Sequence, residues 1–154
     1  MMLEQGATVP AVTLKDAKGT DFTLDAYRGH RLVVYFYPKA DTPGCTNEAR
    51  DFTALAEEFA EAGVPVVGIS KDKPARLAKF AEKYGLRVIL ASDEDGAACE
   101  AFGTWVEKSL YGRKYMGIER ATFLVGADGT ILRVWPKVKV KGHAEEVLGA
   151  VKAS

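Results

Sequence analysis

The chain has 154 residues, of which 47% are hydrophobic, and this size predicts one domain spanning residues 1–154 with a sizeable core. Its 21 basic and 21 acidic side chains cancel, so it lacks the positive field that non-specific nucleic-acid binding needs. Two cysteines cannot make a dense disulfide framework, the opening residues do not resemble a signal peptide, and no apolar run could span a membrane. We therefore expect a soluble, cytoplasmic protein that binds neither nucleic acid nor a membrane.

The first half of the chain predicts a hairpin followed by a parallel strand pair. Two short alternating segments within residues 9–24 are separated by a polar turn with glycine, which indicates an N-terminal β-hairpin. The uniformly apolar stretch 32–37 predicts a central strand covered on both faces. A helical stripe then continues to about Gly63, and residues 64–70 predict a second buried strand, parallel to the first.

Helices and strands continue to alternate in the middle of the chain. A helix with Asp72 as its cap is expected to end at Gly85, where glycine suits a helix terminus. Residues 88–90 predict a short strand, and acidic residues introduce a helix at about 95–103. This last helix contains Cys99, the second of the two cysteines.

The last third of the chain predicts another hairpin and a closing helix. Residues 105–119 are aperiodic and interrupted by glycine, so we expect a long surface connection there. An Asp-Gly turn joins two apolar segments within residues 121–135, and the alternating lysines of 138–141 suit the solvated face of a strand. An amphipathic helix follows over 144–151. The whole order is that of an α/β protein with a thioredoxin-like fold, in which helices flank a mixed central sheet that carries an extra N-terminal β-hairpin.

The stretch 35–46 joins the central strand to a helix and places Cys45 at the joint. A cysteine at a helix N-terminus lies against free backbone N–H groups and the positive end of the helix dipole, and both favour the nucleophilic thiolate. Thr42 adds a hydroxyl three residues earlier, and Pro38 begins the turn. This placement predicts a reactive thiol, although a cysteine after Pro-Gly would by itself also suit a small buried core position.

These residues resemble the active-site pattern of the peroxiredoxins. The spacing Pro38-x-x-x-Thr42-x-x-Cys45 matches that family, and the residues TPGCTNE from Thr42 to Glu48 resemble its bacterioferritin comigratory protein (PrxQ) branch. Similar stretches recur at 105–112, 116–124 and 137–143, so the resemblance covers nearly the whole chain. It implies a thiol-dependent peroxidase that reduces hydrogen peroxide and organic hydroperoxides and needs no metal or organic cofactor.

The resemblance also implies how the peroxide is bound and attacked. Cys45 is the nucleophile and becomes a sulfenic acid. The Thr42 hydroxyl and the backbone N–H groups of Gly44 and Cys45 bind the peroxide oxygens, while Pro38 shields the thiolate from water. Thr42 as a simple turn former and Pro38 as a simple strand terminator are the alternative interpretations.

Arg120, which precedes a predicted strand, matches the catalytic arginine of the family. Its permanent charge could stabilise both the thiolate and the departing oxygen. Glu48 lies three residues after Cys45 on the same helix face and could hold Arg120 in orientation. By position alone, Arg120 would be an ordinary surface arginine and Glu48 an ordinary helix-surface carboxylate.

The resolving cysteine of many PrxQ-like proteins is missing. It lies five residues after the nucleophile or on the next helix, and those positions hold Arg50 and, approximately, Ala81. Cys99 is the only intramolecular candidate, but a helix flanking the sheet would not bring it to Cys45. We therefore expect an external thiol to reduce the sulfenic acid, with thioredoxin as the partner that the resemblance implies. The branch further implies a monomer or a weak homodimer.

Other classes fit the sequence less well. A thiol–disulfide oxidoreductase of this fold would need Cys-x-x-Cys, but Thr42 occupies the first position. A cysteine hydrolase needs a histidine base, whereas we interpret His30 as a loop residue and His143 as a helix-start residue. Neither a metal-ligand spacing nor a Gly-rich dinucleotide fingerprint occurs. A redox-controlled binding protein or chaperone, in which oxidation of Cys45 is a signal, stays open.

Overall fold

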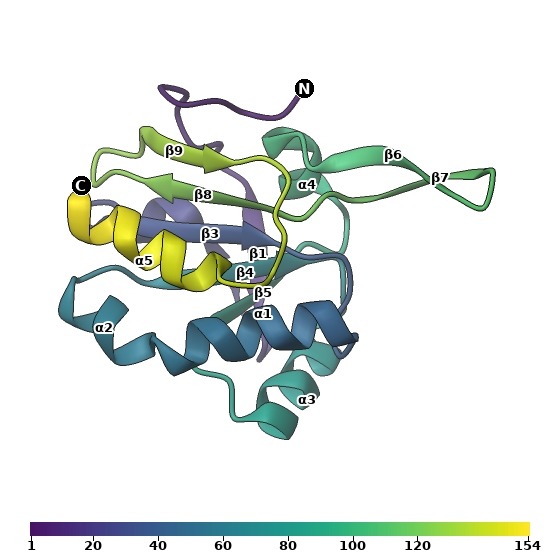
Figure 1. Cartoon of the computed structure of the whole chain (residues 1–154), viewed down its shortest axis with the longest axis horizontal. Coiled ribbons are helices and arrows are strands. Elements are labelled where there is room, and N and C mark those ends of the chain that lie inside the picture. The colour runs from purple at the N-terminus through teal and green to yellow at the C-terminus, as the bar shows by residue number, and fades with distance from the viewer.

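The computed structural model describes residues 1–154, and a seven-stranded sheet runs through the centre of the molecule (Figure 1). The strand order is β2-β1-β5-β4-β3-β8-β9, and β6 and β7 form a separate two-stranded sheet. The strands have these bounds: β1 Thr13–Asp16, β2 Asp21–Thr23, β3 Leu32–Phe36, β4 Val66–Ser70, β5 Ile89–Ser92, β6 Trp105–Leu110, β7 Arg113–Ile118, β8 Ala121–Val125 and β9 Ile131–Trp135.

The centre of the sheet is the predicted parallel pair. β3 runs parallel to β4, β4 runs parallel to β5, and β8 lies antiparallel on the other side of β3. Every residue of β3, β4 and β8 is buried, as expected for strands with helices or chain on both faces. β1 and β2 form the predicted N-terminal hairpin, which joins the sheet beside β5. The sheet is therefore mixed, as the sequence predicted.

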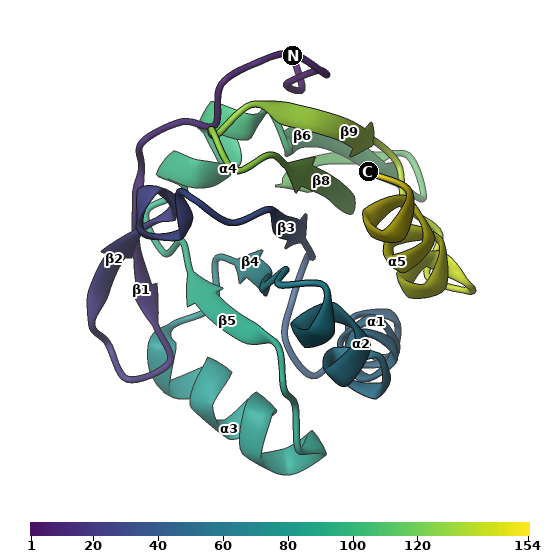
Figure 2. The same ribbon diagram turned by 90° about the vertical axis from the view of Figure 1, so that its left-hand side faces the viewer.

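Two hydrophobic clusters lie on opposite faces of this sheet. Alternation along β3 directs Val33 and Tyr35 into one cluster and Val34 and Phe36 into the other. Helices α1, α2, α3 and α5 pack on the first face, whereas α4 and the N-terminal segment cover the second (Figure 2). The helices have these bounds: η1 Leu24–Tyr27, α1 Pro43–Ala54, α2 Ala56–Glu61, α3 Pro74–Tyr84, α4 Ala97–Phe102 and α5 His143–Ala153.

Two predictions about the first-face helices need correction. The single helix expected to reach Gly63 is broken at Leu55, whose dihedral angles (φ −101°, ψ 9°) separate α1 from α2. The residue before α3 is Lys73, and Asp72 does not cap that helix because its carboxylate is bonded elsewhere. The predicted end of α3 is confirmed, since Gly85 adopts the left-handed conformation with φ 60°.

The expected surface connection at 105–119 is wrong. β6 and β7 form a regular antiparallel hairpin with six paired positions, and its tip is Tyr111-Gly112. Most of its side chains are exposed on both faces, so the sequence lacks the apolar/polar alternation that a half-buried strand shows. Both tip residues have positive φ, a conformation that suits the two-residue turn of a hairpin.

The strand expected at 138–141 is also wrong, because this segment is irregular. The Val138 N–H donates to the carbonyl of Arg120 at 2.9 Å. The segment is therefore hydrogen-bonded to the residue that precedes β8 and does not form a strand of its own. The β8–β9 hairpin, α4 and the closing helix α5 are confirmed close to their predicted positions. None of the helices has the length and apolar character needed to cross a bilayer.

Candidate active site

Cys45 lies in the first turn of α1, just beyond the carboxyl end of β3, and is only 2% exposed. The first hydrogen bond of this turn runs from the Thr46 N–H to the Thr42 carbonyl, at 2.8 Å. The N–H groups of Gly44 and Cys45 come before it, and no side chain caps this end of the helix. Two backbone donors and the positive end of the helix dipole therefore lie beside the sulfur.

The guanidinium of Arg120 connects the thiol to a carboxylate. Its Nη2 lies 3.4 Å from Cys45 Sγ, and its Nη1 donates to Glu48 Oε1 at 2.7 Å. Arg120 immediately precedes β8, whose first residue Ala121 pairs with Phe36 at the end of β3. This register brings an arginine 75 residues downstream of the thiol to the same edge of the sheet.

Because Gly44 has no side chain, the guanidinium of Arg120 can approach the backbone of α1 closely. A Cβ atom at Gly44 would lie 3.3 Å from Arg120 Nη2, so the guanidinium rests almost directly on the helix backbone. A fixed positive charge therefore lies beside the sulfur of Cys45.

Glu48 is the most buried carboxylate near the site, at 1% exposure. One oxygen, Oε1, accepts from Arg120, whereas Oε2 has no hydrogen-bond partner. Burial raises the pKa of Glu48 to about 7, and the neighbouring Arg120 opposes part of that rise. The carboxyl group therefore changes charge close to neutral pH.

Thr42 and Pro38 lie at the open side of the site. The Thr42 hydroxyl donates to the Lys39 carbonyl at 2.7 Å, which commits its one proton and leaves its lone pairs to accept. Such an oxygen is suited to accept a hydrogen bond from the O–H of a peroxide. Pro38 is exposed at the start of the loop that leads to α1.

Sequence reasoning missed two residues that hold this loop from α3 and the turn before it. Asp72 Oδ2 accepts from the Ala40 N–H at 2.8 Å, and Arg76 Nη2 donates to the Ala40 carbonyl at 2.9 Å. The two side chains also pair with each other, with 3.2 Å between Arg76 Nε and Asp72 Oδ1. The i, i+4 spacing of an acid and a base was the one signal in the sequence, and it carried no information about the loop that they bind.

The two histidines have the positions expected of them. His30 is exposed in the loop before β3, and His143 begins α5. Nε2 of His143 lies 2.8 Å from the Thr122 hydroxyl, and its ring meets the edge of Phe52 from α1. Burial lowers the pKa of His143 to about 4. Its hydrogen bond is thus to a core threonine, and the cysteine-hydrolase alternative gains no support.

Cys99 is on the other face of the sheet from Cys45. Both cysteines are free; Cys45 belongs to the cluster under α1, whereas Cys99 is fully buried in the cluster under α4. The Cys99 N–H donates to Asp93 Oδ2 at 2.8 Å, which fixes the first turn of α4. Burial raises the pKa of the Cys99 thiol, so this sulfur is held in its unreactive form.

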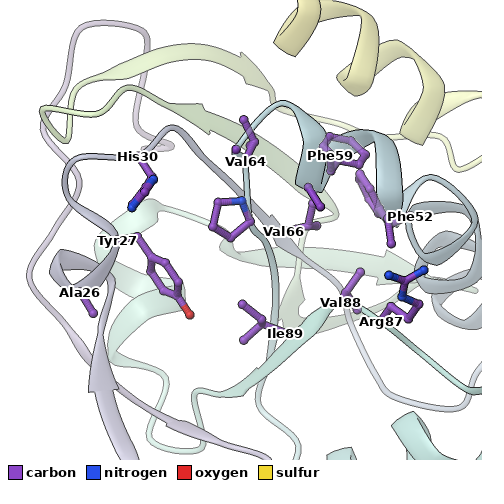
Figure 3. Close-up of a pocket in the computed structure, with 14 residues that line it drawn as sticks. Ala26, Tyr27, His30, Phe52, Phe59, Val64, Val66, Arg87, Val88 and Ile89 are labelled. Carbon is purple, nitrogen blue, oxygen red and sulfur yellow. The ribbon is translucent and has the colours of Figure 1, made fainter.

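A cavity of about 570 Å³ lies away from this site (Figure 3). Its lining includes Tyr27, His30 and Val66, and none of the predicted site residues. Val66 is at the amino end of β4, whereas Cys45 lies beyond the carboxyl end of the parallel strand β3. The thiol site and the apolar cavity therefore lie at opposite ends of the parallel strands.

Comparisons with known proteins agree with this geometry. A model described as the AhpC/TSA family matches residues 5–134. Peroxiredoxin Bcp of Xanthomonas campestris pv. campestris is 47% identical over 152 residues, covering 99% of this chain and 95% of that protein. Peroxiredoxin Bcp of Escherichia coli K12 is 46% identical over 150 residues, with 97% and 96% covered.

A solved structure gives the same result in three dimensions. The bacterioferritin comigratory protein of Xanthomonas campestris, described with its alkyl peroxide reduction activity, has a TM-score of 0.89 at 45% identity. The match covers 99% of this chain and 97% of that one, and it confirms the predicted fold class. The chain therefore belongs to the AhpC/TSA family, as a peroxiredoxin of the Bcp/PrxQ type.

Proposed function

We propose that this peroxiredoxin, a thiol peroxidase, reduces hydrogen peroxide and alkyl hydroperoxides through Cys45. The observation that carries the assignment is the 3.4 Å contact between Arg120 Nη2 and the sulfur of a cysteine at a helix N-terminus. The alkyl peroxide reduction described for the similar Xanthomonas campestris protein supports the substrate class.

The chemistry uses the charges and donors around the sulfur. The Cys45 thiolate attacks one peroxide oxygen in line with the O–O bond, so that an S–O bond forms and the O–O bond breaks. The departing hydroxide or alkoxide takes a proton and leaves as water or an alcohol, and Cys45 becomes a sulfenic acid. Arg120 and the N–H groups of Gly44 and Cys45 stabilise charge as it moves to the oxygens, and Thr42 accepts from the remaining O–H.

An external thiol then completes the cycle. Its thiolate attacks the sulfenic sulfur, water leaves, and a mixed disulfide forms; the second thiol of a dithiol protein such as thioredoxin releases Cys45. The positions of the two cysteines on opposite faces support this one-cysteine cycle, with Cys99 as a packing residue. Since recycling requires reduced thiols, we place the enzyme in the cytoplasm.

We further propose a monomer or a weak homodimer. All of the residues assigned to the site come from one chain: Pro38, Thr42, Gly44, Cys45, Glu48 and Arg120. Turnover therefore needs no residue from a second copy.

The test is peroxide consumption with an excess of reducing thiol, in the wild-type protein and in Cys45→Ser and Cys99→Ser. We expect repeated turnover in the wild type and in Cys99→Ser, and none in Cys45→Ser, because a serine hydroxyl at this site provides no sulfur to oxidise. Turnover by the Cys45→Ser variant would sink the assignment. Consumption of a single equivalent by the wild type would instead favour the redox-controlled binding protein or chaperone.

A further inference from the structure

The β6–β7 hairpin projects from the body of the molecule on the side where β3 ends (Figure 1). Its base is fixed at the edge of the sheet that carries the active site. The Glu119 N–H donates to the Thr104 carbonyl at 2.7 Å, and Nζ of Lys71, the residue after β4, lies 4.0 Å from the centre of the Trp105 ring. β7 ends at Ile118, two residues before the arginine that contacts Cys45.

Exposed apolar side chains gather on this hairpin. The protein has six large hydrophobic residues that are exposed, and four of them belong to the hairpin: Leu110, Tyr111, Tyr115 and Met116. Exposed apolar groups scattered singly need no explanation, but a cluster of this kind indicates an interaction surface. A two-stranded hairpin is also only marginally stable by itself, so contact with a partner would stabilise it.

The two faces of the hairpin differ in charge and packing. On one face Glu107 and Lys114 form an ion pair with 3.6 Å between their charged atoms, and Trp105 and Ile118 at its base pack into the core cluster under α4. The other face, which we call the Lys108 face, carries no acidic side chain. It consists of Val106, Lys108, Leu110, Arg113 and Tyr115, with Gly117 opposite Val106.

The Lys108 face combines free positive charge with apolar surface. None of the ion pairs in the structure includes Lys108 or Arg113. Leu110 is 56% exposed and Tyr115 is 48% exposed. A Cβ atom at Gly117 would lie 3.3 Å from both Lys108 and Tyr115, so these two side chains fold over the strand and present one continuous surface.

We propose that the Lys108 face docks the protein thiol that reduces oxidised Cys45, an inference that rests on the function proposed above. Cys45 is 2% exposed, so a reductant must bring its sulfur to the loop edge of the sheet, and the hairpin projects from the same side of the molecule (Figure 1). The cations of the Lys108 face select a partner with carboxylates, and its aromatic and aliphatic groups favour a partner with apolar surface. The expected partner is therefore a protein whose exposed thiol is flanked by apolar groups and carboxylates.

The experiment compares a protein reductant with a small one. Thioredoxin is the protein probe and dithiothreitol the small probe, in the wild type, in Tyr115→Ser and in Met116→Ser. Tyr115 and Met116 are equally exposed, at 48% and 49%, but they lie on opposite faces of the hairpin. We expect Tyr115→Ser to lower kcat/KM for thioredoxin about tenfold, as for an interface anchor, while Met116→Ser changes it little.

A second pair of variants tests the charge. Arg113→Glu places a carboxylate on the Lys108 face, and Lys114→Glu places one on the opposite face. The first should reduce thioredoxin-dependent turnover more than the second, and added salt should narrow the difference. Turnover with dithiothreitol and the rate of Cys45 oxidation by peroxide should be unchanged in all four variants, which also shows that they fold.

Each outcome separates the two proposals. If dithiothreitol fails to support turnover in the wild type, the peroxidase cycle itself is wrong. If dithiothreitol works and thioredoxin does not, or if Tyr115→Ser and Met116→Ser lose equal thioredoxin-dependent activity, the docking proposal alone is overturned. A sedimentation change in Tyr115→Ser with normal thioredoxin kinetics would assign the face to a second copy of the chain, and would likewise overturn it.

Discussion

At the scale of single residues, Arg120 and Thr42 have separable contacts. Arg120 touches the Cys45 sulfur, whereas the Thr42 hydroxyl donates to the Lys39 carbonyl and has only acceptor capacity left. We therefore predict that Arg120→Met lowers the thiolate fraction of Cys45 at neutral pH and also slows its oxidation. Thr42→Val should slow oxidation while changing that fraction much less. Loss of one such contact commonly costs about 10²–10³-fold in rate.

The rate of alkylation against pH measures the thiolate fraction, and rapid-mixing kinetics with peroxide measure oxidation. Lys39→Ala is a control, because the partner of Thr42 is the backbone carbonyl of that residue and survives the change. Equal losses of thiolate in the Arg120 and Thr42 variants would contradict the division of roles.

Two buried titrating groups make opposite contributions to stability. The pKa of Glu48 rises from 4.5 to about 7, so the folded state keeps a proton that the unfolded chain releases, and this contribution falls as pH rises through that window. The pKa of His143 falls from 6.5 to about 4, so between these pH values the histidine is protonated in the unfolded chain and neutral in the folded state. This contribution to the free energy of unfolding therefore increases as pH rises from about 4 to 6.5. The two slopes oppose each other between about pH 4.5 and 6.5.

We predict that Glu48→Gln removes the contribution of Glu48 and leaves the pH dependence of stability due to His143 unopposed. The free energy of unfolding of the variant, relative to wild type, should rise by on the order of 3 kcal/mol between pH 4.5 and 7, since one pKa unit corresponds to about 1.4 kcal/mol. Denaturant unfolding at closely spaced pH values gives the difference curve. Parallel curves for the two proteins would show that Glu48 titrates normally in the folded state.

At the scale of elements, the active-site loop depends on α3 and the turn before it. Asp72 is nearly buried and accepts from the Ala40 N–H, whereas the ion pair of Lys83 with Asp41, in the same loop, is largely exposed. Asp72→Ala leaves the Ala40 N–H unpaired, so we predict a loss of about 1–3 kcal/mol in the free energy of unfolding and slower oxidation of Cys45. Lys83→Ala should change both quantities little.

Denaturant unfolding and peroxide kinetics on the two variants check this. If Asp72→Ala oxidises as fast as Lys83→Ala, the loop keeps its position without the carboxylate, and Asp72 has no part in positioning the site.

The elements that the sequence predicted are those whose pattern is set by burial. The strands around Val34 and Val67 are buried on both faces, and the helix that ends at Gly85 has one apolar stripe. The β6–β7 hairpin was missed because exposure on both faces removes the pattern, and the break at Leu55 because no proline or glycine marks it. Asp72 was missed because its partner is 32 residues away along the chain.

The candidate site was predictable to the extent that it is local. Cys45, Thr42 and Glu48 lie within seven residues of one another, and their spacing is a family pattern. Arg120 was found only by resemblance, because the pairing of β8 with β3 that brings it to Cys45 is a property of the sheet as a whole.

At the scale of the whole molecule, the sheet separates two thiols with different environments. Cys45 lies at the edge beside a guanidinium, whereas Cys99 is fully buried beneath α4, where burial raises the pKa of its thiol. A disulfide requires Cα atoms within about 7 Å of each other. Forming one here would require α1 or α4 to leave its face of the sheet, and so to expose part of a core cluster.

We therefore predict that peroxide converts Cys45 to a sulfenic acid without forming a Cys45–Cys99 disulfide. Dilute protein is treated with one equivalent of peroxide, trapped with a sulfenic-acid reagent and mapped by mass spectrometry without reduction. Cys99→Ser should keep thioredoxin-linked turnover and lose some stability, because it places a hydroxyl in an apolar cluster. Cys99→Ala is the matched control, since it removes the sulfur without adding a hydroxyl. A rapidly formed Cys45–Cys99 disulfide in the wild type, together with loss of turnover in both variants, would make this an atypical two-cysteine enzyme whose helices leave the sheet during each cycle.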